Sequence, residues 1–149
     1  MSATVLLDSG PLGVLSNPKT TVATVTARQR LAVLRGAGLR IIVPEIADYE
    51  VRRELLRVKS QRGLANLDQL AIQLEYVPLT TAAVRRAAEL WAQARQQGQQ
   101  TASNYSLDSD VLLAAQALTL GVASIVIGTF NVAHLSRYVA AELWENITP

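Results

Sequence analysis

Residues 4–13 read TVLLDSGPLG, a short apolar run that ends at Asp8 and is followed by a Ser-Gly-Pro cluster. A run of four to eight apolar residues bounded by turn-forming residues is typical of a fully buried β-strand. The pattern therefore predicts a buried strand with a carboxylate at its carboxyl end and a turn over residues 9–11. Taken alone, Asp8 could equally be an ordinary turn or helix-cap aspartate.

The rest of the chain alternates strand-like and helix-like segments. LRIIVP at 39–44, EYVPL at 75–79 and VASIVI at 122–127 favour further strands, and the tail AAELWENI at 140–147 fits either an edge strand or a short helix. Apolar residues at helical spacing predict helices over 20–38, from 45 to near 63, and over 64–74, 80–97 and 109–119, the last capped by Ser106 or Asp108. Strands separated by helices predict an α/β domain with a central, mostly parallel sheet of four to five strands.

Composition limits the chemistry that this chain can perform. Its 149 residues show no repeat or linker, so we expect a single domain over 1–149. The absence of Cys excludes disulfides, thiolate zinc sites and a cysteine nucleophile. His134 is the only histidine, which excludes a nuclease that uses two histidines and a three-histidine zinc site. An enzyme built from this sequence must therefore rely on carboxylates and a bound cation.

Charge and hydropathy give two further expectations. The net charge of +2 does not indicate a general nucleic-acid binder, yet basic residues cluster between Arg52 and Arg62 with only Glu54 opposing them. That run could contact phosphates or could be a solvated helix face. Residues 111–136 carry no charge, but polar residues and Gly121 interrupt them. We expect a buried helix and strand there and no membrane span. The lack of Cys, together with a start that does not resemble a signal peptide, fits a cytoplasmic location.

Three acidic residues stand at positions where a metal site could form. Asp8 ends the first strand, Glu50 lies inside the helix that follows Pro44, and Asp110 follows Asp108 at the start of a later helix. Glu50 could instead pair with Arg53 in solvent, and Glu45 is its rival for a role in the site. Ligands of parallel sheets bind beyond the carboxyl ends of the strands, and hard cations prefer oxygen ligands. We therefore expect the carboxylates to meet at that edge.

Four segments in this order resemble the PIN-domain family, and in particular the VapC-like ribonuclease toxins of type II toxin–antitoxin pairs. They are TVLLDSGPLG, VPEIADYEVRREL, LDSDVLLAAQAL and ASIVIGTFN, and the resemblance covers essentially the whole chain. It implies a PIN-like three-layer fold. Two departures stand out: Asn131 replaces the fourth acid of many members, and His134 with Leu135 lies near the position of an Asp/Glu-Phe pair.

The resemblance also implies an activity, a metal-dependent endoribonuclease that hydrolyses RNA phosphodiester bonds. Its catalytic residues would be Asp8, Glu50 and Asp110, which with Asp108 would hold one or two Mg²⁺ or Mn²⁺ ions that activate water. Thr129 and Asn131 would orient the phosphate or water. Contacts to the RNA backbone would come from Arg52, Arg53 and Arg57.

The same resemblance implies a homodimer and a small antitoxin protein as partner. The alternative within the family is a catalytically inactive PIN scaffold that binds RNA or a protein. A phosphorylation domain of the response-regulator type is disfavoured, because it needs a lysine late in the chain and the only lysines are Lys19 and Lys59.

Overall fold

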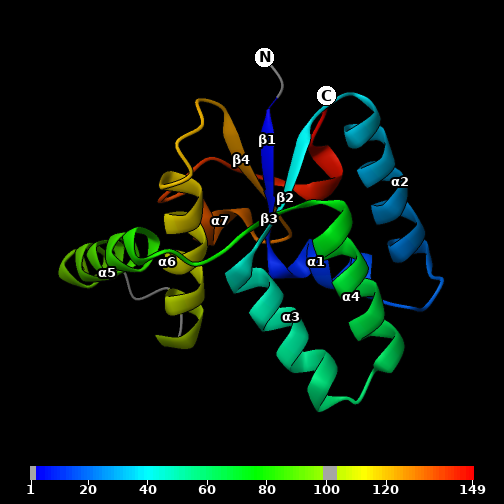
Figure 1. Ribbon diagram of the computed structural model, residues 1–149. Helices are drawn as coiled ribbons and strands as arrows, with labels where there is room; N and C mark the ends of the chain where they lie inside the picture. Colours follow the sequence, from blue (N-terminus) through cyan, green and yellow to red (C-terminus); the bar gives the residue numbers. More distant parts are fainter. Residues whose placement is uncertain (1–2, 99–103) are drawn as a thin grey trace.

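A five-stranded parallel sheet forms the centre of the protein, whose computed structural model describes residues 3–98 and 104–149 (Figure 1). The strand order is β3-β2-β1-β4-β5, and every neighbouring pair is parallel. The strands are β1 (Thr4–Leu7), β2 (Arg40–Pro44), β3 (Glu75–Val77), β4 (Ile125–Thr129) and β5 (Ala141–Leu143). The predicted α/β fold with a parallel central sheet is confirmed.

Helices connect the strands and cover both faces of the sheet. They are α1 (Ser9–Ser16), α2 (Val22–Gly36), α3 (Glu45–Arg57), α4 (Gln61–Gln73), α5 (Thr81–Gln96), α6 (Asn104–Leu118), α7 (Val132–Leu135) and the short 3₁₀ helix η1 (Trp144–Asn146). Figure 1 shows α1, α2 and α4 on one side of the sheet and α5, α6 and α7 on the other. The arrangement gives the three layers expected of a PIN-like fold.

The side chains of β1 explain this layering. Val5, Leu6 and Leu7 are all 0% exposed. Val5 and Leu7 pack into the core that includes residues of α1, α2 and α4, whereas Leu6 packs toward α6 and α7, because successive side chains of a strand point to opposite faces. Burial of such a side chain contributes about 1.5–3 kcal/mol, so a strand buried on both faces anchors both helical layers.

The topology places a crevice at the carboxyl end of β1. From β1 the chain builds β2 and then β3 on one side, and it later returns to add β4 and β5 on the other. Strand order therefore reverses at β1, and ligands of open parallel sheets bind outside the carboxyl ends of strands at such a reversal. Asp8 follows β1 at this point, and Thr129 ends the neighbouring β4.

Several element boundaries differ from the sequence-based expectations. Residues 9–16 form α1 where a turn was expected over 9–11. A proline in the first turn of a helix is tolerated because the amide groups there have no partner within the helix. The helix that begins at Glu45 ends at Arg57 rather than near Gly63, since Lys59 has a φ of 56° and Ser60 then caps α4.

The largest difference concerns α6, which begins at Asn104 rather than at residue 109. Asp108 and Asp110 therefore lie beyond its first turn, so the expected position of Asp110 at the helix start and the expected cap by Ser106 or Asp108 are wrong. β4 begins at Ile125 instead of Val122, α7 was not expected, and the ambiguous tail forms both β5 and η1. Within the described ranges, no helix is both long and apolar enough to span a bilayer.

Candidate active site

Asp8 is held rigidly at the end of β1. Its amide donates to the carbonyl of Gly128 (2.9 Å), which continues the ladder with β4. As the N-cap of α1, its Oδ1 accepts a hydrogen bond from the amide of Ser9 (2.7 Å). Its Oδ2 accepts from the hydroxyl of Thr129 (2.8 Å), and that same hydroxyl oxygen accepts from the amide of Asn131 (2.9 Å). The carboxylate is therefore fixed by the start of α1 and by the end of the neighbouring strand β4.

Glu50 reaches the same region from α3. Its side chain is 19% exposed, and its Oε2 accepts a hydrogen bond from the hydroxyl of Ser109 (3.0 Å). The guanidinium of Arg53 lies 3.9 Å from this oxygen. The pKa of Glu50 is raised above its ordinary value, mainly by burial and further by the charge of Asp8. The hydrogen bond from Ser109 and the charge of Arg53 partly oppose this rise. Glu50 is thus a partly desolvated carboxylate that shares its surroundings with another acid.

Glu50 lines the acidic pocket, whereas Glu45, the other candidate on α3, lies elsewhere. The carboxylate of Glu45 accepts a hydrogen bond from the amide of Leu79 (2.8 Å), in the segment that leads from β3 into α5. It lines a different hollow, together with Asp48 and Tyr76. Glu45 therefore serves the packing of that loop and does not approach Asp8.

Asp110 is the most perturbed acid of the site. Its side chain is 18% exposed, and its Oδ2 is buried with no hydrogen-bond partner. Nδ1 of His134 lies 3.7 Å from this oxygen. Burial is the main cause that raises the pKa of Asp110 to about 6; the charges of His134 and Arg137 oppose the rise, whereas those of Asp8 and Glu50 add to it.

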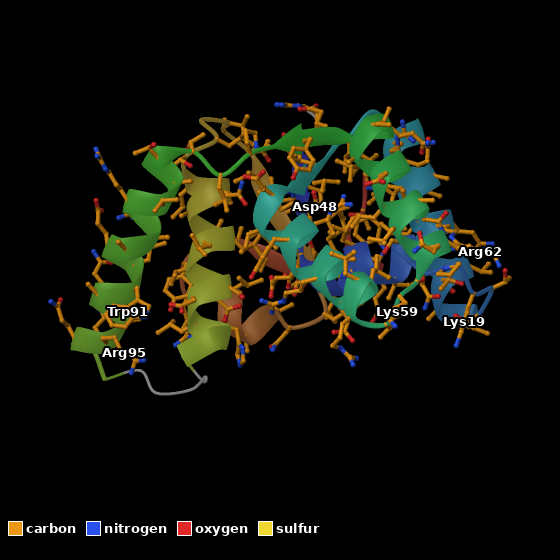
Figure 2. All side chains as sticks on the ribbon, turned by 60° about the horizontal axis from the view of Figure 1, so that its bottom comes forward. Lys19, Asp48, Lys59, Arg62, Trp91 and Arg95 are labelled. Carbon is orange, nitrogen blue, oxygen red and sulfur yellow. The ribbon has the colours of Figure 1, made fainter. Side chains whose placement is uncertain are left out.

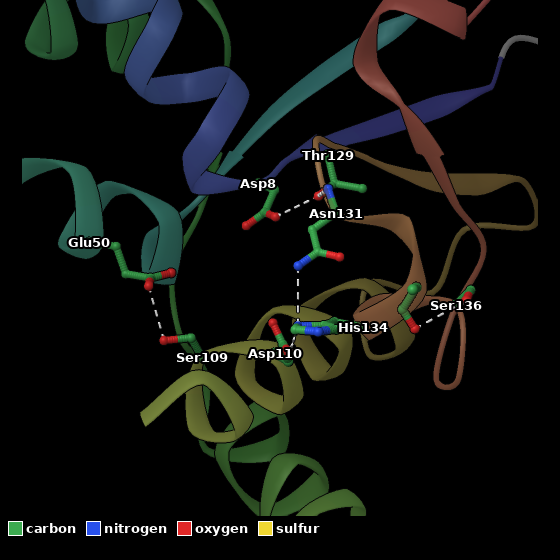
Figure 3. A network of polar contacts seen from close by, with 9 residues as sticks. Asp8, Glu50, Ser109, Asp110, Thr129, Asn131, His134 and Ser136 are labelled. Carbon is green, nitrogen blue, oxygen red and sulfur yellow. Dashed lines mark hydrogen bonds and ion pairs between the residues drawn. The ribbon is translucent and has the colours of Figure 1, made fainter. Parts of the chain in front are cut away.

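These side chains line one pocket of about 270 Å³ (Figure 3). Asp8, Glu50 and Asp110 come from three different elements and surround it, and Asn131 and His134 enter from the start of α7. The lining residues are Asp8, Ser9, Glu50, Arg53, Ser109, Asp110, Asn131 and His134. Thr129 lies behind Asp8 and is 0% exposed, so its hydroxyl orients that carboxylate.

Other residues that the sequence suggested for the site lie elsewhere. Asp108 is exposed and lines a hollow between α5 and α6, beside Val84 and Trp91. Arg52 forms ion pairs with Asp48 (3.0 Å) and Asp68 (2.8 Å).

Of the other basic residues in this run, only one lines the acidic pocket. Arg57 pairs with Glu54 (2.5 Å) on the outer part of α3. Lys59 and Arg62 lie at and after the turn into α4 (Figure 2). Of the basic run between residues 52 and 62, Arg53 is the member that lines the acidic pocket.

Two residues of the site carried no prediction of a site role. Ser109 holds Glu50, and His134 contacts both Asp110 and Asn131, whose amide nitrogen lies 3.2 Å from its Nδ1. Ser109 could have been noticed as the neighbour of Asp110 on a helix. The role of His134 could not have been predicted, because the direction of its side chain depends on α7. This single turn of helix has no sequence pattern of its own.

The donor set of the pocket suits a hard divalent cation. Carboxylate and amide oxygens are the ligands of Mg²⁺ and Mn²⁺. The unpartnered Oδ2 of Asp110 and the raised pKa of both Asp110 and Glu50 indicate negative charge that the protein itself does not compensate. As the described side chains stand, no three His, Asp or Glu residues converge on one ion position. Glu50 would have to exchange its bond with Ser109 for a cation.

The burial of Asp110 predicts a pH-dependent cost to folding. Since the folded-state pKa of about 6 exceeds the ordinary 3.8, the folded protein binds the proton more tightly, and stability rises as pH falls from about 6 to about 4. Above about pH 6 the ionised carboxylate destabilises the fold. We expect Asp110→Asn to increase the free energy of unfolding at pH 7.5 by about 1–3 kcal/mol in EDTA, a gain that disappears near pH 4.

Thermal and urea denaturation over this pH range measure the effect. Asp108→Asn is the matched control on the same helix; as an exposed carboxylate it should change stability by no more than about 0.5 kcal/mol at any pH. An Asp110→Asn protein that is no more stable than the parent at pH 7.5 would contradict the electrostatic description of the pocket.

Comparison with known proteins agrees with this fold. The family model described as PIN domain matches residues 19–140. No curated protein sequence matches the chain.

Solved structures of similar fold include VapBC2 from Rickettsia felis bound to a DNA fragment from its promoter, with a TM-score of 0.74 and 18% identity over 95% of this chain and 98% of that chain. VapBC-1 from nontypeable Haemophilus influenzae (TM-score 0.67) and DNA-bound VapBC from Salmonella typhimurium (TM-score 0.65) each share 17% identity over 95% of this chain and 98% of theirs. At these identities the likeness establishes the fold. With most of its length matched by the family model, the chain belongs to the PIN-domain family.

Proposed function

We propose that the protein is a metal-dependent endoribonuclease and the toxin of a toxin–antitoxin pair. The observation that carries this proposal is the pocket in which Asp8, Glu50 and Asp110, contributed by three separate elements, meet at the reversal point of a parallel sheet. Membership of the PIN-domain family and the likeness to VapBC structures support it. A binding scaffold would have no need for the uncompensated buried charge of Asp110, which is destabilising without a cation.

Each pocket residue has a role that follows from its contacts. Asp8, Glu50 and Asp110 would hold one or two Mg²⁺ or Mn²⁺ ions, which supply a nucleophile at neutral pH and stabilise charge on the phosphate oxygens. Thr129 holds Asp8 in place, and Ser109 holds Glu50.

Two further groups face the substrate. Asn131 is exposed at the rim of the pocket, and its amide nitrogen, which has two hydrogens, can donate to a phosphate oxygen as well as face Nδ1 of His134. Arg53 lies beside Glu50, where its guanidinium can bind the adjacent phosphate.

The surface next to the pocket has room for a nucleotide. A second hollow of about 410 Å³ shares Ser9, Glu50 and Arg53 with the acidic pocket and continues over Gly10 and Gly13. Its lining is more apolar than that of the acidic pocket, which suits a base, whereas the acidic pocket suits a cation with a phosphate. The RNA backbone would cross the pocket at Arg53, with one base in this second hollow.

Substitution of the carboxylates tests the proposed activity. We expect Asp8→Asn and Asp110→Asn to reduce cleavage of RNA in Mn²⁺ at least about 100-fold, because metal ions contribute several kcal/mol to such reactions. Asp108→Asn, which lies outside the pocket, should cleave at the parental rate. The measurements are RNA cleavage by the purified chain and its melting temperature with and without Mn²⁺, which should rise with the metal.

The inactive-scaffold alternative predicts a different result. A parental protein that gains no thermal stability from Mn²⁺ or Mg²⁺ and cleaves no RNA, yet binds RNA equally with Asp8 or Asn at position 8, would be a binding module. Equal loss of activity in Asp108→Asn and Asp8→Asn would show that the pocket was wrongly assigned.

The arginines on α3 offer a matched comparison for RNA binding. We expect Arg53→Gln to weaken RNA affinity at 50 mM salt and to lower the slope of log affinity against log salt by about 1, as the loss of one phosphate contact would. Arg57→Gln, whose arginine is already paired with Glu54 and lies outside the pocket, should keep the parental slope. Measurements on the Asp8→Asn background prevent cleavage during the titration. If both substitutions have the same effect, Arg53 is not a specific phosphate contact.

The partners belong to the same proposal. The solved structures of similar fold are VapBC assemblies, which favours a small antitoxin protein as partner. A homodimer of this chain and action in the cytoplasm are further parts of the proposal. We expect the product of a small neighbouring gene to co-purify with the chain and to inhibit cleavage. Light scattering of the purified chain should give about twice its mass of 16.1 kDa. A monomer would contradict the dimer, and a neighbouring product that neither binds nor inhibits would contradict the antitoxin.

A further inference from the structure

His134 occupies an unusual place in this acidic pocket. It is the only histidine of the chain, and it stands on the single turn of α7 with a side chain that is 34% exposed. Its Nδ1 lies 3.7 Å from Oδ2 of Asp110 and 3.2 Å from the amide nitrogen of Asn131 (Figure 3). Asp110 and His134 come from different helices, α6 and α7, and they meet at the rim of the pocket.

We propose that His134 is a metal ligand alongside Asp110, and that its nitrogen makes this centre select Mn²⁺ over Mg²⁺. The inference rests on the metal dependence proposed above and deepens it by naming the ion. It concerns the side of the pocket that Asn131 and His134 line from α7.

The spacing of the two donors supports this assignment. A nitrogen and an oxygen 3.7 Å apart are too distant for a hydrogen bond. Ligands bind transition metals at about 2.0–2.2 Å, so two donors of one ion stand roughly 3.0–3.7 Å apart. Oδ2 of Asp110 is also the buried oxygen that has no hydrogen-bond partner. An ion bound to both atoms would give that oxygen the partner it lacks.

The contact with Asn131 supports a ring nitrogen that is ready to bind a metal. The amide nitrogen of Asn131 faces Nδ1, an arrangement that fits the tautomer in which Nδ1 carries the lone pair and Nε2 the proton. A cation at Nδ1 would take this lone pair and displace the Asn131 amide. A histidine binds metal through such a lone pair, in the neutral form. Asn131 therefore favours the tautomer that a ligand requires, and its amide would give up the contact with Nδ1 when the cation binds.

The chemistry of the donor determines the selectivity. Mg²⁺ demands oxygen ligands and gives up its waters reluctantly. Imidazole nitrogen suits first-row transition metals, so replacement of a carboxylate by histidine favours Mn²⁺ relative to Mg²⁺. Neutral imidazole also contributes no negative charge, which weakens the purely electrostatic attraction on which Mg²⁺ depends.

Metal titrations on the full chain at pH 8 test the selectivity. We expect His134→Ala to weaken Mn²⁺ binding at least about tenfold while Mg²⁺ binding stays within about twofold. His134→Asp should strengthen Mg²⁺ binding and reduce the ratio of the two affinities. Ser136→Ala is the control: Ser136 is the C-cap residue of α7, is exposed and donates to the carbonyl of Ala133, so both affinities should be unchanged.

Pulsed electron paramagnetic resonance of bound Mn²⁺ gives a direct readout that needs no variant to fold. The parent should show hyperfine coupling to a histidine nitrogen, and His134→Ala should lose it. Bound Mn²⁺ without nitrogen coupling, or equal loss of both metals in His134→Ala, would overturn the assignment of His134 and leave the nuclease proposal standing. A parent that binds neither metal would overturn both.

Discussion

The structure depends on a strand that is buried on both faces and ends in a charge. β1 has helices on either side and strands on either edge, so its backbone and side chains have a single compatible position. Asp8 is the first residue past it, and its carboxylate is fixed by the Ser9 amide at the start of α1 and the Thr129 hydroxyl at the end of β4. Because the parallel register aligns the ends of β1 and β4, the same constraint that organises the core also places this carboxylate at the crevice.

Around this fixed point the protein collects charge that it does not neutralise. Glu50 and Asp110 are brought beside Asp8 by α3 and α6, and burial raises the pKa of both. Arg53 and His134 are the positive or potentially positive groups at the rim, at 3.9 Å and 3.7 Å, too far to form short ion pairs. By contrast, Arg52 forms close ion pairs with Asp48 on its own helix, α3, and with Asp68 on α4. Charged groups that are paired within the protein, such as Arg52, stabilise the fold. Charged groups without a close partner, such as those of the pocket, are available to a ligand.

Much of this arrangement could be read from local patterns. The apolar run before Asp8, the alternation of strands and helices, and the order of the acidic segments all depend on residues close in sequence, and they predicted the sheet and the family correctly. Patterns failed where a competing contact decides the outcome. Ser-Gly-Pro was taken for a turn but begins α1, and α6 starts five residues early. Asp108 lines the hollow between α5 and α6 instead of the acidic pocket. Helical pattern left Glu45 and Glu50 open, and the family resemblance favoured Glu50. In the structure Glu45 accepts a hydrogen bond from the amide of Leu79, away from the pocket.

The sequence by itself determined the layered α/β fold and the chemical class of the site, because burial periodicity and the lack of Cys and of a second His are properties of the chain alone. Only the tertiary structure decided which charged groups share a pocket. That choice depends on how α3, α6 and α7 are directed around the sheet edge, which is fixed by packing between residues far apart in sequence. Thus Ser109 meets Glu50 across 59 positions, and Thr129 meets Asp8 across 121. His134 lies beside Asp110 for the same reason, although no sequence pattern in its own segment predicts this position.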